Sequence, residues 1–402
     1  MKKYTALAGF AAALLLTAGA QAQITKDTIK IGVLADMSSL YADLGGPGSV
    51  MAAKMAVEDF GGTLNGKKIE VVSADHQNKP DVGASIARQW FDQDGVDMIT
   101  DLTTSSVALA VQEVARKENK VLLITSAASS DLTGKACAPT SIHWMYDTVA
   151  LANGTGAAVV KAGGDTWYFI TADYAFGHSL QNDTTAVVEA NGGKVLGSVN
   201  VPLNTADFSS YLLQAQGSKA KVIGLANAGG DTINSIKQAA EFGIVKGGQK
   251  LAGLLVFASD VHSLGLETAQ GLQLTEGFYW DMDDQTRAWS KKFFDKMNKE
   301  PTMAQAGVYS AVMNYLNAVK AVNTLDGPAV VKQLKSKPVN DFAVRNGHIR
   351  DDGSLPHDMY LFEVKKPSES KGPWDFYKLI ATIPGDQAFK RPHGNECPAA
   401  KG

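Results

Sequence analysis

Short apolar runs alternate with longer segments of helical periodicity along most of the chain. The first apolar run, at 29–34, predicts a strand, and the segment 49–60 carries an apolar stripe of helical spacing (Val50, Met51, Met55 and Val57). The same alternation predicts further strands at 69–72, 98–99 and 121–124, and helices at 81–93 and 106–118. A series of this kind indicates a parallel sheet covered by helices on both faces.

The pattern then starts again and indicates a second unit of the same kind. It predicts helices at 153–162, 176–190, 208–216 and 232–242, and strands at 166–171, 194–201, 222–225 and 251–257. Helices at 284–298 and 304–324 and a strand at 358–364 follow, and the tail is rich in proline, glycine and charge. The predicted fold class is therefore α/β, with two similar lobes built on parallel sheets.

The first residues, MKKYTALAGFAAALLLTAGAQA, differ in kind from the rest of the chain. Two lysines precede an apolar stretch, and Ala20-Gln21-Ala22 matches the A-x-A pattern of a cleavage site. This pattern predicts a secretory signal peptide over 1–22, cleaved after Ala22. The alternative is a membrane anchor, for which the apolar stretch is short. We therefore expect an exported, soluble protein of the periplasm.

The net charge limits the classes of partner, and the two cysteines bear on the compartment of the protein. The 402 residues carry a formal net charge of −3, so nothing in the charge favours nucleic acid or an anionic membrane as a partner. The two cysteines, Cys137 and Cys397, are expected to form a disulfide in an oxidising compartment. The alternative is two unpaired thiols.

The carboxyl ends of the predicted strands carry the candidate binding residues, because ligands of open parallel sheets bind there. The first lobe offers TDLTTSS after 98–99 and TSAASS after 121–124. Such hydroxyls can cap the following helix, and a helix start can hold an anion. The second lobe offers Tyr174, Phe176 and Asn227, although such aromatic side chains are also common in cores. Together these strand ends predict a cleft for a small ligand with a carboxylate and an apolar body.

Motifs of catalysis and of cofactor binding are missing from the sequence. The segment GGTLNGKK resembles a phosphate loop, but Lys68 stands where a hydroxyl is needed and a strand follows it. There is no G-x-S-x-G, H-E-x-x-H or C-x-x-C, and the seven histidines are scattered. We therefore expect neither an enzyme nor a cofactor or metal site. The rival reading is an exported α/β enzyme, which would need a catalytic cluster.

From Ile29 to about Ala388 the chain resembles the branched-chain-amino-acid-type periplasmic binding proteins that serve ABC transporters. The resemblance rests on the order of IGVLADMSS, GGPGSVMAAKMAVED, ITSAASSDLTG, DYAFGHSL, QAAEFG and AQGLQLTEGFYW. It implies two lobes joined by three crossovers, near Asp147, Gly277 and Leu355. The lobes are then 23–147 with 278–355, and 148–277 with 356–402. It also implies a monomer whose partners are permease subunits with cytoplasmic ATPases.

The same resemblance implies roles for individual residues. The stretch Thr103, Thr104 and Ser105 and the stretch Ser126, Ala127, Ala128 and Ser129 match positions that hold a ligand carboxylate. Phe176 matches an aromatic residue that closes over the ligand from the second lobe. Candidates for stacking on a ligand ring are Tyr41, Trp144, Tyr146 and Tyr174.

One departure from the family pattern concerns the ligand's amine. Amino-acid-binding members place an acid after the strand that matches 251–256, whereas this chain has VFASD there, with Asp260 out of register. We therefore predict an organic acid without an amine, of aromatic type. An amino acid ligand, and a sensor that presents its ligand to a membrane receptor, remain the alternatives.

Overall fold

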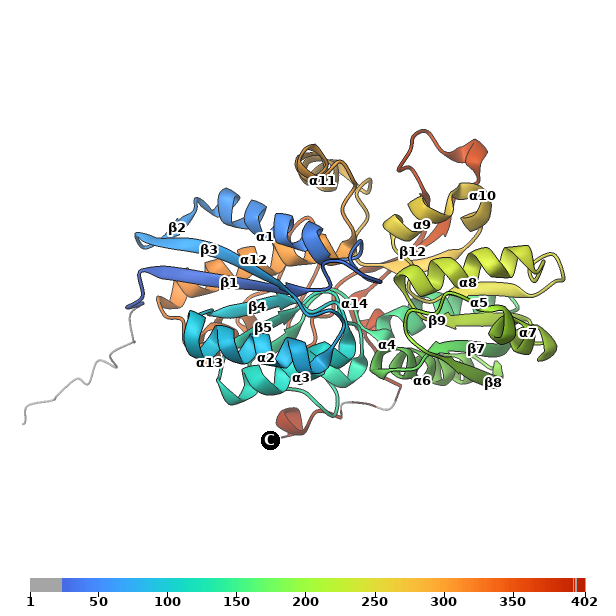
Figure 1. The fold of residues 1–402 in the computed structure, drawn as a ribbon, viewed down its shortest axis with the longest axis horizontal. Coiled ribbons are helices and arrows are strands. Elements are labelled where there is room, and N and C mark those ends of the chain that lie inside the picture. The colour runs from blue at the N-terminus through green and yellow to red at the C-terminus, as the bar shows by residue number, and fades with distance from the viewer. Residues whose placement is uncertain (1–23, 393, 395, 402) are drawn as a thin grey trace, which may run out of the picture.

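The structure is a computed structural model that describes residues 24–392, 394 and 396–401 (Figure 1). The predicted signal peptide, 1–22, lies outside the described residues. Two helix-covered parallel sheets lie side by side, one in each lobe (Figure 1). Within the described part of the chain, no helix is both long enough and apolar enough to span a membrane.

The first lobe is built on a six-stranded sheet in the order β2-β3-β1-β4-β5-β6. All neighbours pair in parallel except the short edge strand β2. The strands are β1 (Thr28–Ala35), β2 (Thr63–Leu64), β3 (Lys67–Asp75), β4 (Met98–Asp101), β5 (Val121–Ile124) and β6 (Ser141–His143). The central strands β4 and β5 are buried along their whole length, which explains their continuous apolar runs.

Helices cover both faces of this sheet (Figure 1). One face is covered by α1 (Gly46–Phe60) and α12 (Met303–Val322), with α13 (Gly327–Lys335) beside α12. The other face is covered by α2 (Pro80–Gln89), which continues as a π-helical turn (Trp90–Asp94), and by α3 (Ser105–Lys117). The alternating residues Ile29, Ile31 and Val33 of β1 are fully buried in the core that α1 and α12 close.

The second lobe is built on a four-stranded parallel sheet in the order β10-β9-β7-β8. The strands are β7 (Thr166–Ala172), β8 (Lys194–Val201), β9 (Val222–Ala226) and β10 (Lys250–Gly253). The connecting helices are α6 (Ala175–Ala190), α7 (Ser209–Gly217) and α8 (Gly229–Glu241), preceded by α4 (Thr148–Leu151), a π-helical turn (Ala152–Gly156) and α5 (Ala157–Lys161). The predicted α/β class with two lobes is confirmed.

The structure also contains a third sheet, which is antiparallel and has the strand order β11-β12-β13. Its strands are β11 (Gln273–Glu276), β12 (Met359–Val364) and β13 (Tyr377–Ile383). Only β12 was predicted. Residues 378–382 of β13 are all exposed, so the strand lacks the alternation that marks a half-buried strand. The strand predicted over 251–257 was wrong beyond Gly253: residues 254–257 are buried as a loop that leads into a helix.

The remaining elements are short, apart from one long helix. They are α9 (Ala258–Leu264), α10 (Leu266–Ala269), α11 (Asp284–Met297), α14 (Gly385–Ala388) and the 3-10 turns Ser130–Leu132, Pro367–Glu369 and Pro398–Lys401.

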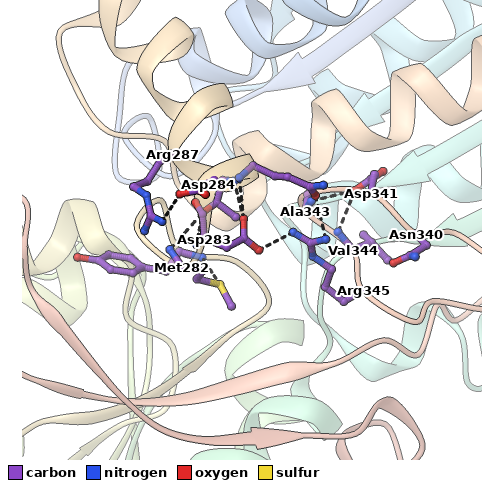
Figure 2. A network of polar contacts seen from close by, with 12 residues as sticks. Met282, Asp283, Asp284, Arg287, Asn340, Asp341, Ala343, Val344 and Arg345 are labelled. Atoms are coloured by element: carbon purple, nitrogen blue, oxygen red, sulfur yellow. Dashed lines mark hydrogen bonds and ion pairs between the residues drawn. The ribbon is translucent and has the colours of Figure 1, made fainter.

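A polar network fixes the start of α11 to the segment that follows α13 (Figure 2). The Asp283 carboxylate accepts hydrogen bonds from the first turn of α11 and pairs with Arg345 at 2.8 Å. On the other side Asp341 accepts from the amides of Ala343 and Val344, both at 2.9 Å. The network therefore stabilises the chain just beyond the predicted crossover near Gly277.

The predicted disulfide between Cys137 and Cys397 is present, with the two Cα atoms 5.5 Å apart. The last described turn, Pro398–Lys401, lies below α3 in the view of Figure 1. A second contact holds the same tail, because the Arg391 guanidinium donates to the Thr133 hydroxyl at 2.6 Å and to the Ser130 carbonyl at 3.2 Å. The tail is thus fastened to the loop that follows β5.

Candidate functional site

A small cavity lies between the lobes, beyond the carboxyl ends of strands from both parallel sheets. Its free volume is only about 10 Å³, roughly the space of one water molecule, so the two lobes nearly close it in this structure. Eight of the predicted site residues line it: Tyr41, Thr103, Ser105, Ser126, Ala128, Tyr146, Tyr174 and Phe176. The other lining residues are Leu44, Ala228 and Leu255.

The first lobe gives this cavity a polar wall. The Ser105 hydroxyl accepts hydrogen bonds from the amides of Ala128 at 3.2 Å and Ser129 at 3.1 Å. No side chain caps the start of α3, so the N–H groups of its first turn remain available to an anion. The Ser126 hydroxyl lines the cavity and has no hydrogen-bond partner among the described residues.

Thr104 and Ser129 lie behind this wall, with their hydroxyls turned to other partners. The Thr104 hydroxyl donates to the Asn78 side chain. The Ser129 hydroxyl bonds the Ser179 hydroxyl of α6 at 2.6 Å, which is a contact between the lobes. Neither side chain lines the cavity.

Ala127 and Asn227 also lie outside the cavity lining. The Ala127 carbonyl contacts the His143 ring nitrogen Nε2 at 2.6 Å. The Asn227 amide oxygen accepts from Thr232 at 2.8 Å and its amide nitrogen donates to Ser235 at 3.3 Å, so the side chain is engaged by α8. Ala228, the next residue, is the one that lines the cavity.

The second lobe gives the cavity a mainly apolar wall, made of Tyr174, Phe176, Ala228 and Leu255. The rings of Tyr174 and Phe176 lie 5.8 Å apart, centroid to centroid. The Tyr174 hydroxyl bonds the Tyr41 hydroxyl of the first lobe at 2.7 Å. This bond and the one between Ser129 and Ser179 show that the lobes meet around the cavity.

Asp260, the acid considered for a ligand amine, is used inside its own loop. Its carboxylate accepts the Phe257 amide at 2.9 Å at the start of α9, and the residue is 2% exposed. Burial raises the pKa of the Asp260 carboxyl to about 7. Asp260 does not line the cavity, whereas Leu255 of the same loop does.

Asp101, at the end of β4, is an acid near the cavity that the sequence analysis did not single out. It is fully buried, and its Oδ1 accepts a hydrogen bond at 3.2 Å from Thr103, which lines the cavity. Burial raises the pKa of the Asp101 carboxyl to about 6. The signal was available in TDLTTSS, where an acid directly follows a buried apolar strand.

Within the described part of the chain, no three His, Cys, Asp or Glu side chains come together as metal ligands.

Comparison with known proteins places the chain in a family. The sequence profile of the periplasmic binding protein family matches residues 28–372. A periplasmic binding protein from Burkholderia mallei is 56% identical, with a TM-score of 0.91 over 93% of this chain and 99% of that one. A branched-chain amino acid ABC transporter periplasmic ligand-binding protein from Burkholderia xenovorans LB400 is 42% identical, with a TM-score of 0.83 over 92% of this chain and 100% of that one.

The same fold occurs at lower identity. An ABC transporter solute-binding protein from Rhodopseudomonas palustris HaA2, in complex with p-hydroxybenzoic acid, is 21% identical, with a TM-score of 0.82 over 90% of this chain and 99% of that one. The resemblance inferred from the motifs is therefore confirmed. The chain belongs to the periplasmic binding protein family, whose members bind solutes for transporters and are not enzymes.

Proposed function

We propose that this protein captures a small carboxylate with an aromatic body in the periplasm and delivers it to the permease subunits of an ABC importer. The main support for the proposal is that the cavity has one polar wall and one mainly apolar wall. The first lobe supplies the hydroxyls of Thr103, Ser105 and Ser126, and the second lobe supplies rings and aliphatic side chains. A carboxylate faces the first wall and the aromatic body faces the second.

The loop after β10 supports a ligand without an amine. An ammonium group taken out of water without a partner costs several kcal/mol. At this loop the cavity is lined by Leu255, and the nearby Asp260 carboxylate is engaged with the Phe257 amide. The complex of the R. palustris protein shows that the fold accommodates an aromatic carboxylate.

A branched-chain amino acid is the second candidate ligand, and two observations favour it. The B. xenovorans relative carries that description at 42% identity. Asp101 provides a buried acid next to the polar wall, where it could meet an ammonium group.

A thermal-shift screen of small carboxylates tests the proposed ligand class. A ligand that binds only the native state stabilises it, by about 2.7 kcal/mol at a concentration of 100 Kd. Benzoate and 3-phenylpropanoate are expected to raise the melting temperature, and leucine, isoleucine and valine to leave it unchanged. A rise with the three amino acids and none with the aromatic acids would establish the second candidate.

Replacement of Ser126 with alanine is expected to weaken the binding of an aromatic carboxylate by about 1–3 kcal/mol, because a charged acceptor loses a donor. Titration calorimetry of the variant measures this loss. Ser210 is a matched control, since it is an exposed serine of α7 and Ser210→Ala should leave the affinity unchanged. Equal affinities of Ser126→Ala and the parent protein would remove this hydroxyl from the site.

A further inference from the structure

Three buried polar atoms without a hydrogen-bond partner among the described residues lie together at the polar wall. They are Asp101 Oδ2, Ser126 Oγ and Ser49 Oγ, and their residues are between 0 and 5% exposed. The two hydroxyls approach the Asp101 carboxyl closely enough to lower its pKa, but neither forms a well-directed hydrogen bond to it. Native proteins leave few such groups unpaired, so this cluster needs an explanation.

The backbone conformation at Asp101 also indicates that this cluster has a function. Asp101 and Leu102 have φ angles of 78° and 61°, a left-handed backbone conformation that residues other than glycine rarely adopt. Strain of this kind persists at functional sites, where the surrounding structure holds it in place. Here it brings the Asp101 carboxyl behind Thr103 and Ser126, both of which line the cavity.

Among the described residues, no cation is one of the main groups that shift the pKa of the Asp101 carboxyl. The charge named among them is that of another acid, Asp36, directly after β1. Tyr146, beyond β6, keeps its proton because burial raises its pKa, and burial lowers the pKa of His143 in β6 to about 4, so its ring is neutral. The charges of the helices packed on this edge lie beyond their first two turns: Lys54, Glu58 and Asp59 of α1, Glu113, Arg116 and Lys117 of α3, and Lys320 of α12.

A carboxylate ligand on this wall would therefore meet a buried acid with no cation to offset either charge. Two buried carboxyls that share a site hold one proton between them. Asp101 Oδ1 already accepts the Thr103 hydroxyl, which leaves Oδ2 as the oxygen able to carry that proton.

We propose that Asp101 determines the specificity of the site by binding one proton together with the ligand carboxylate. The proton comes from solvent and resides on Asp101 Oδ2, which donates to Ser126 Oγ. The Ser126 hydroxyl in turn donates to the ligand. The inference rests on the proposed function, because a ligand with an ammonium group would pair with ionised Asp101 and take up no proton.

Calorimetric titration with benzoate, in two buffers of different ionisation enthalpy at pH 7, tests the proposal. The parent protein should take up close to one proton per benzoate, because free Asp101 is mostly ionised at that pH. Its affinity should then fall as pH rises above about 6, by up to tenfold per pH unit while the bound form stays protonated. Asp101→Asn should bind benzoate with no proton uptake and with an affinity independent of pH.

Asp260→Asn is the matched control, since Asp260 is also a buried acid of raised pKa but does not line the cavity. This variant should keep the proton uptake of the parent. Benzoate binding by the parent without proton uptake would overturn the role of Asp101 and leave the proposed function intact. Binding of leucine in place of any aromatic acid, lost in Asp101→Asn, would overturn both.

Discussion

Cys137→Ser lowers the free energy of unfolding by roughly 5 kcal/mol, the chain-entropy value for closing so long a loop. The two cysteines are 260 residues apart in sequence, so the bridge removes a large part of the freedom of the unfolded chain. Urea denaturation followed by circular dichroism measures the change. Cys397→Ser should give the same loss, and the two substitutions together should cost no more than either alone. A loss below about 1 kcal/mol would show that the tail contributes little to stability.

Gly177→Ala both destabilises the protein and abolishes ligand binding at concentrations that saturate the parent. A Cβ atom at Gly177 would overlap the backbone of Ala172, whose carbonyl carbon would lie 2.8 Å away and whose nitrogen 2.9 Å away. Backbone atoms at the end of β7 cannot yield as a flexible side chain does, so α6 has to move. Overpacking of this kind costs typically 1–3 kcal/mol. Because Phe176 precedes Gly177 in α6, the same movement shifts the aromatic wall of the cavity.

Thermal denaturation and titration with a confirmed ligand measure these two effects of Gly177→Ala. Gly217 provides the control, because a Cβ atom there meets nothing within 4 Å and the residue lies at the end of a helix. Gly217→Ala should leave binding unchanged and stability equal or slightly higher. Parent-like stability and affinity in Gly177→Ala would show that the start of α6 tolerates displacement.

The inner strands β4, β5 and β9 of the parallel sheets were predictable because they are buried along both faces and therefore read as short, largely apolar runs. The third sheet was not, since β13 exposes most of its residues and β11 has only four. The loop Leu254–Phe257 shows the opposite error: it is as apolar and buried as a strand but makes no ladder. Periodicity reports burial, and hydrogen-bonded pairing has to be inferred from it.

The candidate site was predictable to the level of strand ends but less reliably to the level of single side chains. Thr103, Ser105 and Ser126 line the cavity as expected, whereas Thr104, which lies between the first two in sequence, does not. The left-handed backbone at Asp101 and Leu102 turns the chain just before these threonines, and no glycine in the sequence announces that turn. Leu44, Ala228 and Leu255 line the cavity because the two lobes meet there, and apolar residues at such positions cannot be distinguished from core residues by pattern alone.

The disulfide has a consequence for motion as well as for stability. The tail leaves the three-stranded sheet after β13 and is bonded to Cys137 beyond β5 of the six-stranded sheet. It is thus a tether that runs outside the polypeptide crossovers and closes the chain into a covalent ring. Opening of the lobes is bounded by the reach of that tether, which its length of chain limits. We therefore expect the lobes to open more widely when the Cys137–Cys397 bond is reduced, because reduction releases the tether.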